Sequence, residues 1–313
     1  MPYVAAYRCL FIILPVVLLF HGIAEPADKR TPRVAIVISQ SIRPYLIASE
    51  GLREELARDT GATIEEFDLE KFKGKSRNLL SMDLEKGGFD LFIAIGPSAT
   101  RFVWAHFPSM DVQKLYTMVL NPEGILTPEQ SACGITLRIP LTTQLQCISL
   151  GLPSVERLGI LYDPLYNSDL ITQVTGSIGD TGVKIIPIVI SSRRDIPLVL
   201  KQSWKFLDAL LLIPDRTVIS ESIVQYIIKQ AILNKVPVIG YNRFFYESGA
   251  ALAFILNYKE IGRQTSRAAT RMLSGEACKN EPPIFHAWVN TRVIQKLGIG
   301  RIQEYNTPLE AGP

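Results

Sequence analysis

Short runs of branched and aliphatic residues recur along the chain, and each run is followed by a polar turn and a helix-like stretch. RVAIVIS (33–39) and LFIAI (91–95) are almost wholly apolar, whereas a strand exposed on one face alternates apolar and polar residues. Strands buried on both faces are typical of parallel sheets that helices cover on both sides. The repeated order of strand, turn and helix therefore predicts the α/β class.

The alternation restarts near residue 141, after a first set of strands that ends with GITL (134–137). The second set of strand-like runs is RLGILY (157–162), KIIPIVI (184–190), DALLLI (208–213), PVIGY (237–241) and ALAFIL (251–256). A chain of 313 residues is long enough for two ordinary domains. We therefore expect two Rossmann-like lobes, each with a parallel sheet.

The tail after residue 256 is too short for a third core. It contains one amphipathic helix, whose shared face consists of Ile261, Thr265, Ala268, Ala269 and Met272, and a last strand at 284–289. Both elements must dock on the earlier lobes, so the chain passes between the lobes more than once and forms a multi-strand hinge. We expect lobe one at 31–140 plus about 257–282, and lobe two at 141–256 plus about 283–305.

The N-terminal segment 1–24 has the pattern of a cleavable signal peptide. Arg8 precedes an unbroken apolar run from Leu10 to Phe20, and small residues precede a cleavage site after Ala24. As a helix this run measures about 16 Å, against about 30 Å of bilayer hydrocarbon. We expect export to the periplasm or another extracytoplasmic compartment; the alternative is an uncleaved membrane anchor.

Charge and cysteine content exclude several classes of protein. The net charge is only +3 and no Lys/Arg run stands out, which argues against a nucleic-acid partner. Cys133, Cys147 and Cys278 remain after signal removal, so at least one is unpaired within a monomer, and the pairing stays open. The sequence contains no CxxC motif and no Cys/His cluster, so we expect no metal and no cofactor.

The segment PVIGYNRFFYESGAALAFILNYKEIGRQTSRAATRMLSGE (237–276) resembles the substrate-binding proteins of ABC transporters of the aromatic-amino-acid type. The resemblance rests on Ser248-Gly249-Ala250, on Tyr258, and on Ile261-Gly262-Arg263-Gln264, and it extends to VNTRVIQKLGI (289–299). Asp163-Pro164 with Asn167-Ser168, and Pro214-Asp215-Arg216-Thr217-Val218, are similar to two further turns of that family. The resemblance implies the type I periplasmic binding protein fold. Arg216 departs from the family pattern, which commonly has Asn there.

Candidate ligand-binding residues follow from the geometry of open α/β sheets, in which ligands bind beyond the carboxyl ends of the strands. In lobe one these residues are Ser39, Ser41, Gly96, Ser98, Ala99, Thr100 and Asn121. In lobe two they are Asp163, Asn167, Ser168, Asp215, Arg216 and Asn242, and Tyr258 lies at the hinge crossing.

Each candidate also has a purely structural interpretation. The amides of 98–100 either hold a carboxylate or belong to a plain helix cap, and Asn167-Ser168 has the same two possibilities. Asp215 either pairs with a ligand ammonium or sits in an internal ion pair, and Arg216 either binds a carboxylate or lies in a solvated turn. Of Phe244 and Phe245, expected in a loop, at most one is predicted to stack on a flat ligand.

Enzyme motifs are missing from the sequence: it has no GxSxG elbow, no P-loop, and no GxGxxG after the first strand. We therefore expect an exported, monomeric solute-binding protein and no catalysis. Its two lobes close on a small ligand, such as an amino acid, and deliver that ligand to an ABC permease in the membrane. The alternative is a ligand-sensing or envelope-regulatory subunit with the same fold.

Overall fold

The computed structural model describes residues 30–108, 112–127, 130, 133–176, 182–299 and 309–312. The predicted signal peptide lies outside these residues. Within the described part of the chain, no helix is long and apolar enough to cross a membrane.

The first sheet has five strands in the order β2-β1-β3-β4-β5, and all of its pairings are parallel. Its strands are β1 (Arg33–Ile38), β2 (Thr63–Asp68), β3 (Leu91–Ile95), β4 (Gln113–Val119) and β5 (Gly134–Thr136). Because the strands are parallel, the loops that leave their carboxyl ends all lie at one edge of this sheet.

The second sheet has seven strands in the order β12-β11-β10-β9-β8-β6-β7. They are β6 (Arg157–Tyr162), β7 (Lys184–Val189), β8 (Ala209–Leu212), β9 (Val238–Gly240), β10 (Leu252–Leu256), β11 (Phe285–Val289) and β12 (Leu309–Ala311). Only the β10–β11 pairing is antiparallel among the described pairs, with Leu252 opposite Val289. The expectation of two α/β lobes with parallel sheets is confirmed.

Helices cover both faces of the first sheet. On one face lie α1 (Arg43–Thr60) and α9 (Tyr258–Leu273), whose apolar residues share a core with alternate residues of β1 and β3. The opposite face carries α2 (Lys75–Lys86) and α3 (Pro97–His106). Short 3-10 helices, η1 (Leu69–Lys71) and η2 (Pro122–Gly124), lie in the connections.

The second sheet is covered in the same way. One face carries α4 (Leu141–Gly151), α5 (Pro164–Gly176) and α10 (Thr291–Leu297). The other face carries α6 (Ile196–Ser203), α7 (Glu221–Leu233) and α8 (Arg243–Glu247), with η3 (Trp204–Phe206) after α6. Each sheet therefore has its own two-sided core.

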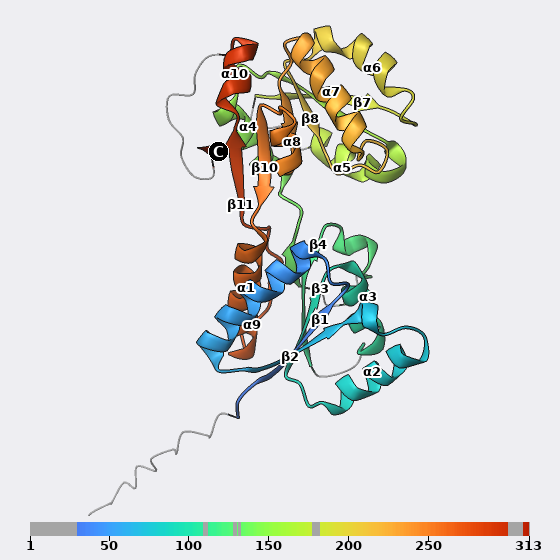
Figure 1. The fold of residues 1–313 in the computed structure, drawn as a ribbon, viewed down its shortest axis with the longest axis vertical. Helices are drawn as coiled ribbons and strands as arrows, with labels where there is room; N and C mark the ends of the chain where they lie inside the picture. The colour runs from blue at the N-terminus through green and yellow to red at the C-terminus, as the bar shows by residue number, and fades with distance from the viewer. Residues whose placement is uncertain are drawn as a thin grey trace, which may run out of the picture. The chain divides into compact units, whose positions relative to one another are not determined.

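The helix after β10 belongs to the first sheet although it is encoded late in the chain. In Figure 1, α9 lies alongside α1, and the two backbones approach closely. A Cβ placed on Gly262 of α9 would lie 2.0 Å from the carbonyl oxygen of Ala48, and one on Gly51 would lie 2.3 Å from the carbonyl oxygen of Lys259. Glycine at both positions lets the helices pack in contact.

The chain therefore connects the two sheets three times. It leaves the first sheet through 137–140, returns at Asn257, and crosses again through 278–284, which we call the third crossing. These crossings agree with the expected multi-strand hinge, while the residues that we assign to each lobe stay a prediction.

Several local expectations needed correction. The helices α2, α8 and α10 were not predicted, and Phe244 and Phe245 lie in α8, not in a loop. Pro44 lies in the first turn of α1, where proline lacks only an N–H that has no helical partner. The segment 196–206 is divided between α6 and η3.

Candidate functional site

The loop after β1 meets the start of α3 at the carboxyl edge of the first sheet. The Ser39 hydroxyl accepts a hydrogen bond from the Ala99 N–H at 2.9 Å, and the Ser39 N–H donates to the Ile95 carbonyl at 2.9 Å. Gly96 has a φ of 87°, and a Cβ there would lie 2.7 Å from Cζ of Tyr45. Ser39 therefore caps α3, and the Tyr45 ring packs against Gly96.

The first turn of α3 separates the predicted residues into buried and exposed ones. Ala99 and Thr100 are fully buried, and the Thr100 hydroxyl donates to the Gly96 carbonyl at 2.9 Å. Ser98 is exposed. The structure thus brings Ser39, Gly96, Ala99 and Thr100 together, with Ser98 on the solvent side.

Two tyrosines sit close to this corner. Burial raises the pKa of Tyr258, and burial together with the influence of Tyr258 raises the pKa of Tyr45. Both rings also pack against the core that α1 and α9 share. Tyr258, predicted at the hinge crossing, is the first residue of α9, directly after Asn257.

The other lobe-one candidates, Ser41 and Asn121, are exposed and bonded to neighbouring loops. The Ser41 hydroxyl donates to the Asp68 carboxylate after β2. The Asn121 side-chain oxygen accepts from the Arg138 guanidinium at 2.6 Å, and Arg138 also pairs with Glu123 at 3.3 Å. These contacts place Ser41 and Asn121 on different loops at the same sheet edge.

At the corresponding edge of the second sheet, two buried aspartates link the loops after β6 and β8. Asp163 is 6% exposed and Asp215 only 2%. The Asp215 carboxylate accepts from the Asp163 N–H at 2.9 Å, from the Asn167 amide at 2.7 Å and from the Thr217 N–H at 2.8 Å. The Thr217 hydroxyl in turn donates to the Asp163 carboxylate at 2.7 Å.

These bonds form what we call the Asp163–Asp215 network. Asn167 interrupts α5 with a non-helical φ of −136°, which places its amide on Asp215. Tyr241, after β9, lies near the network: burial and then the charge of Asp215 raise its pKa to about 12. The described partners of Asp215 are N–H and amide groups, so this is a hydrogen-bond network and not the internal ion pair named as one of the two alternatives.

Arg216 differs in burial from Asp215, the residue before it. It is exposed, and its guanidinium lies over the Tyr166 ring at 5.5 Å from the centroid. Ser168 is also exposed, while the Asn242 side chain caps α8 by accepting from the Phe245 N–H at 3.3 Å. Of the lobe-two candidates, Arg216 and Ser168 are therefore the ones that face solvent most.

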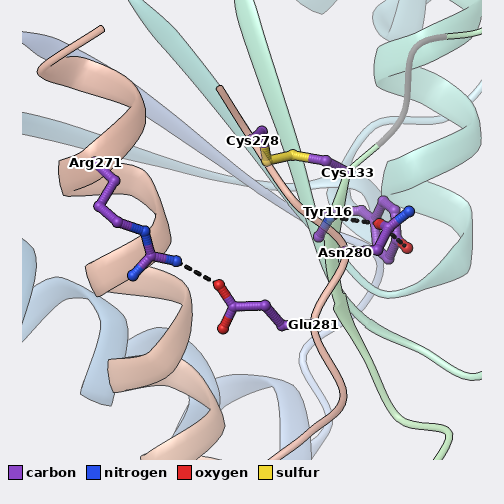
Figure 2. Close-up of a disulfide and its surroundings, with 7 residues drawn as sticks. Tyr116, Cys133, Arg271, Cys278, Asn280 and Glu281 are labelled. Atoms are coloured by element: carbon purple, nitrogen blue, oxygen red, sulfur yellow. Dashed lines mark hydrogen bonds and ion pairs between the residues drawn. A yellow bond between two sulfur atoms is a disulfide. The ribbon is translucent and has the colours of Figure 1, made fainter. Parts of the chain in front are cut away.

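The third crossing is fastened to the first sheet. A disulfide joins Cys278 to Cys133, just before β5 (Figure 2). Cys147 is a buried free cysteine. The Tyr116 hydroxyl donates to Asn280 at 2.8 Å, and Arg271 of α9 pairs with Glu281. The Glu281 N–H donates to the Gly134 carbonyl, so the crossing runs along the edge of β5.

Several residues of these edges escaped the sequence analysis. Four such residues contact the predicted ones: Tyr45, Arg138, Tyr166 and Thr217. Of these, Tyr166 and Thr217 lie inside turns that the sequence had singled out. Across the described residues no group of three or more His, Cys, Asp or Glu side chains could hold a metal ion.

Two α/β lobes, connected by several crossings and carrying polar loops at the carboxyl ends of parallel strands, define the type I periplasmic binding protein class. A family model described as "ABC transporter substrate binding protein" matches residues 48–305. The chain belongs to this family. No curated protein matches the sequence.

Solved structures share the fold at low sequence identity. An open, ligand-free substrate binding protein with adhesive properties from Clostridium difficile is 17% identical, with a TM-score of 0.72, and the alignment covers 90% of this chain and 100% of that one. A protein from Streptococcus pneumonia in complex with L-Trp is 18% identical, with a TM-score of 0.55 over 88% and 96% of the two chains. A putative LacI transcriptional regulator from Bacteroides fragilis is 10% identical, with a TM-score of 0.51 over 82% and 96%.

Proposed function

We propose that this protein is the exported solute-binding component of an ABC importer. It binds a small organic solute, such as an amino acid, between its two lobes and delivers it to a permease in the membrane. The observation that carries the proposal is that both parallel sheets end in loops rich in polar groups, in a chain of the substrate-binding family.

The mechanism is closure about the three crossings. The open and closed states differ by a few kcal/mol, and a ligand that contacts both lobes selects the closed state. The predicted residues that are exposed for such contacts are Ser41, Ser98 and Asn121 of lobe one, and Ser168 and Arg216 of lobe two. Ser39, Thr100 and the Asp163–Asp215 network hold the loops in place. The mechanism needs no cofactor and no catalytic step.

A periplasmic or other extracytoplasmic location is part of this proposal. The disulfide between Cys133 and Cys278 supports it, because disulfides persist mainly in oxidising compartments. A signal peptide at 1–24 is consistent with that location. If the signal is cleaved, the mature chain begins at Glu25, which N-terminal sequencing of the exported protein checks; intact Met1-containing protein in the membrane fraction contradicts cleavage.

A second candidate function is ligand sensing or envelope regulation. The similarity to a putative LacI regulator favours it, because that protein has the same fold outside transport. The two functions share solute binding and differ in the partner. Uptake of labelled solute by cells with and without the gene distinguishes them: lost uptake supports transport, and unchanged uptake supports sensing.

Solute binding itself is tested by purifying the mature protein and identifying what co-purifies. Mild denaturation followed by mass spectrometry is expected to release one small organic molecule in near-stoichiometric amount. Adding this molecule back should raise the unfolding midpoint of the ligand-free protein. A ligand at a hundred times its Kd increases the free energy of unfolding by about 2.7 kcal/mol. If no small molecule co-purifies, and none from a broad solute library shifts the midpoint, the protein is not a solute receptor.

A further inference from the structure

At the carboxyl edge of the second sheet, three aspartate carboxylates accept hydrogen bonds from the protein, whereas three arginine side chains are exposed. The aspartates of its loops face inward: Asp215 accepts three hydrogen bonds within the network, and the Asp163 carboxylate accepts from Thr217. Asp195, after β7, accepts from the N–H groups of Ser191 and Ser192, the latter at 2.8 Å. Their carboxylates are thus occupied by donors of the protein itself.

The arginines of the same loops face outward. Arg193, Arg194 and Arg216 are exposed, and within the described part of the chain none of them has a carboxylate partner. The Arg193 guanidinium donates to the Thr217 carbonyl at 3.2 Å, directly beside Arg216. This edge therefore presents three exposed arginines against one exposed carboxylate named here, Glu221 at the start of α7, so positive charge is in excess among these residues.

The first sheet shows the same arrangement. Asp68 is engaged by Ser41 and by the Glu70 N–H, and Glu123 is paired with Arg138. Arg43, the first residue of α1, is exposed and has no ion pair among the described residues.

The helices that begin at these edges reinforce the positive potential. A helix N-terminus carries partial positive charge and commonly attracts an acidic residue in its first turn. The first turns of α1, α3 and α5 contain none, whereas the first turn of α7 contains Glu221.

We propose that the solute is an organic carboxylate with an apolar body and without an ammonium group. This inference rests on the proposed function and narrows its ligand. Arg216, held over Tyr166, presents a planar fork that matches a carboxylate. Leu165 and Ile219, which are 77% and 55% exposed, flank it with apolar surface. Beside Arg216 an ammonium group would meet Arg193, because Asp163, Asp195 and Asp215 already accept hydrogen bonds from the protein.

The test compares matched sets of ligands by calorimetric titration of the mature protein. Each set has one apolar body: 3-phenylpropionate, its amide and L-phenylalanine; indole-3-propionate, its amide and L-tryptophan; 4-methylpentanoate, its amide and L-leucine. In at least one set the acid should bind at least about tenfold more tightly than the amide and the amino acid, as expected for losing a charged hydrogen-bond partner.

Arg216→Gln should remove most of this preference for the acid while leaving binding of the amide nearly unchanged. The matched control is Arg292→Gln, an exposed arginine of α10, which follows the antiparallel strand β11 and so starts at the opposite edge of the sheet. Both variants should keep the unfolding midpoint of the unliganded protein, because both side chains are exposed.

Three results overturn the inference: an amino acid or amide binds as tightly as its acid, Arg216→Gln weakens acid and amide equally, or no member of the sets binds. If no member binds but a neutral or zwitterionic solute co-purifies, the carboxylate inference is wrong and the receptor function stands. If nothing binds and nothing co-purifies, the receptor function is wrong as well.

Discussion

At the scale of single residues, the adjacent pair Asp215 and Arg216 places a buried and an exposed side chain in one turn. Asp215 is buried and joins two loops whose sequences lie about fifty residues apart, as the separation of 52 between Asp163 and Asp215 records. Arg216 points into solvent over an aromatic ring. Loss of the first should affect folding, and loss of the second should affect binding.

Asp215→Ala is therefore expected to destabilise the protein. It leaves the N–H groups of Asp163 and Thr217 and the Asn167 amide without their acceptor, and unsatisfied buried donors cost about 1–3 kcal/mol each before the loops rearrange. We expect a loss of at least about 2 kcal/mol, measured by thermal and denaturant unfolding. The control is Asp83→Ala, an exposed carboxylate on α2 that should change stability by less than about 0.5 kcal/mol. Equal stability of the two variants would contradict the scaffold role.

Tyr241 is expected to make the free energy of unfolding fall at alkaline pH. Its pKa is raised to about 12 from 10.0, so the folded state holds the phenol proton more tightly than the unfolded state does. The free energy of unfolding should be unaffected by this group below pH 10 and should fall as the pH rises from 10 to 12.

Absorbance titration near 295 nm is expected to show phenolate formation at Tyr241 delayed relative to the exposed tyrosines. In Tyr241→Phe, this delayed component and its share of the alkaline loss of stability should both shrink. Ionisation of all tyrosines together near pH 10 would refute the assignment.

At the scale of elements, sequence patterns predict regular buried segments well and short ones poorly. Strands β1 and β3 and the helix α9 were predicted because their apolar runs or 3.6-residue periodicity are continuous, whereas the three-residue strand β12 was not predicted. The helices α8 and α10 have five and seven residues, too few for a periodic signal. The helix α2 has only Leu80 and Leu84 buried, which leaves a narrow apolar stripe in a polar segment.

The candidate site is harder to predict from the sequence than the fold is. Topology locates the loops at one edge of each sheet, so Ser39 and the 96–100 turn could be predicted together, and the structure brings them together. Long-range contacts decide which side chains of these loops are buried. One example is the hydrogen bond between Asn167 and Asp215, which are 48 residues apart in sequence. No local pattern encodes a contact of that range.

The contact between α1 and α9 gives a prediction for an element pair. Gly262→Ala would place a methyl group 2.0 Å from the Ala48 carbonyl oxygen, so the helices must move apart. Overpacking of this kind costs about 1–3 kcal/mol, which denaturant unfolding would measure. The control is Gly124→Ala, at an exposed glycine where the new methyl group meets nothing within 4 Å. If the Gly262→Ala variant is as stable as that control, the two helices can move apart at little cost in stability, and the prediction is wrong.

At the scale of the whole molecule, the disulfide is the longest-range covalent restraint. It joins residues 145 apart and ties the third crossing to the first sheet. Removing a cross-link that closes a loop of that size is expected to cost about 3–5 kcal/mol. Cys133→Ser with Cys278→Ser should therefore lower the free energy of unfolding by that amount, whereas Cys147→Ser should leave the disulfide intact.

Thiol labelling provides the independent check. The mature protein should react with one equivalent of thiol reagent after denaturation, and only slowly when native, because Cys147 is buried and burial raises its pKa. Three reactive thiols in the oxidised, denatured protein would show that the disulfide does not form.

The path of α9 has a consequence for the order in which the protein matures as it is made. Residues 33–136 supply every strand of the first sheet, yet one face of that sheet is covered by α1 alone until residues 258–273 arrive. The cysteine that locks its edge strand, Cys278, arrives later still. If the chain is exported from its N-terminus, as we propose, the first lobe is completed only after residues 141–257 have emerged, and the second lobe still awaits β11, α10 and β12. The apolar face of the first lobe must therefore be shielded, by chaperones or by the translocation machinery, while most of the other lobe is still being delivered.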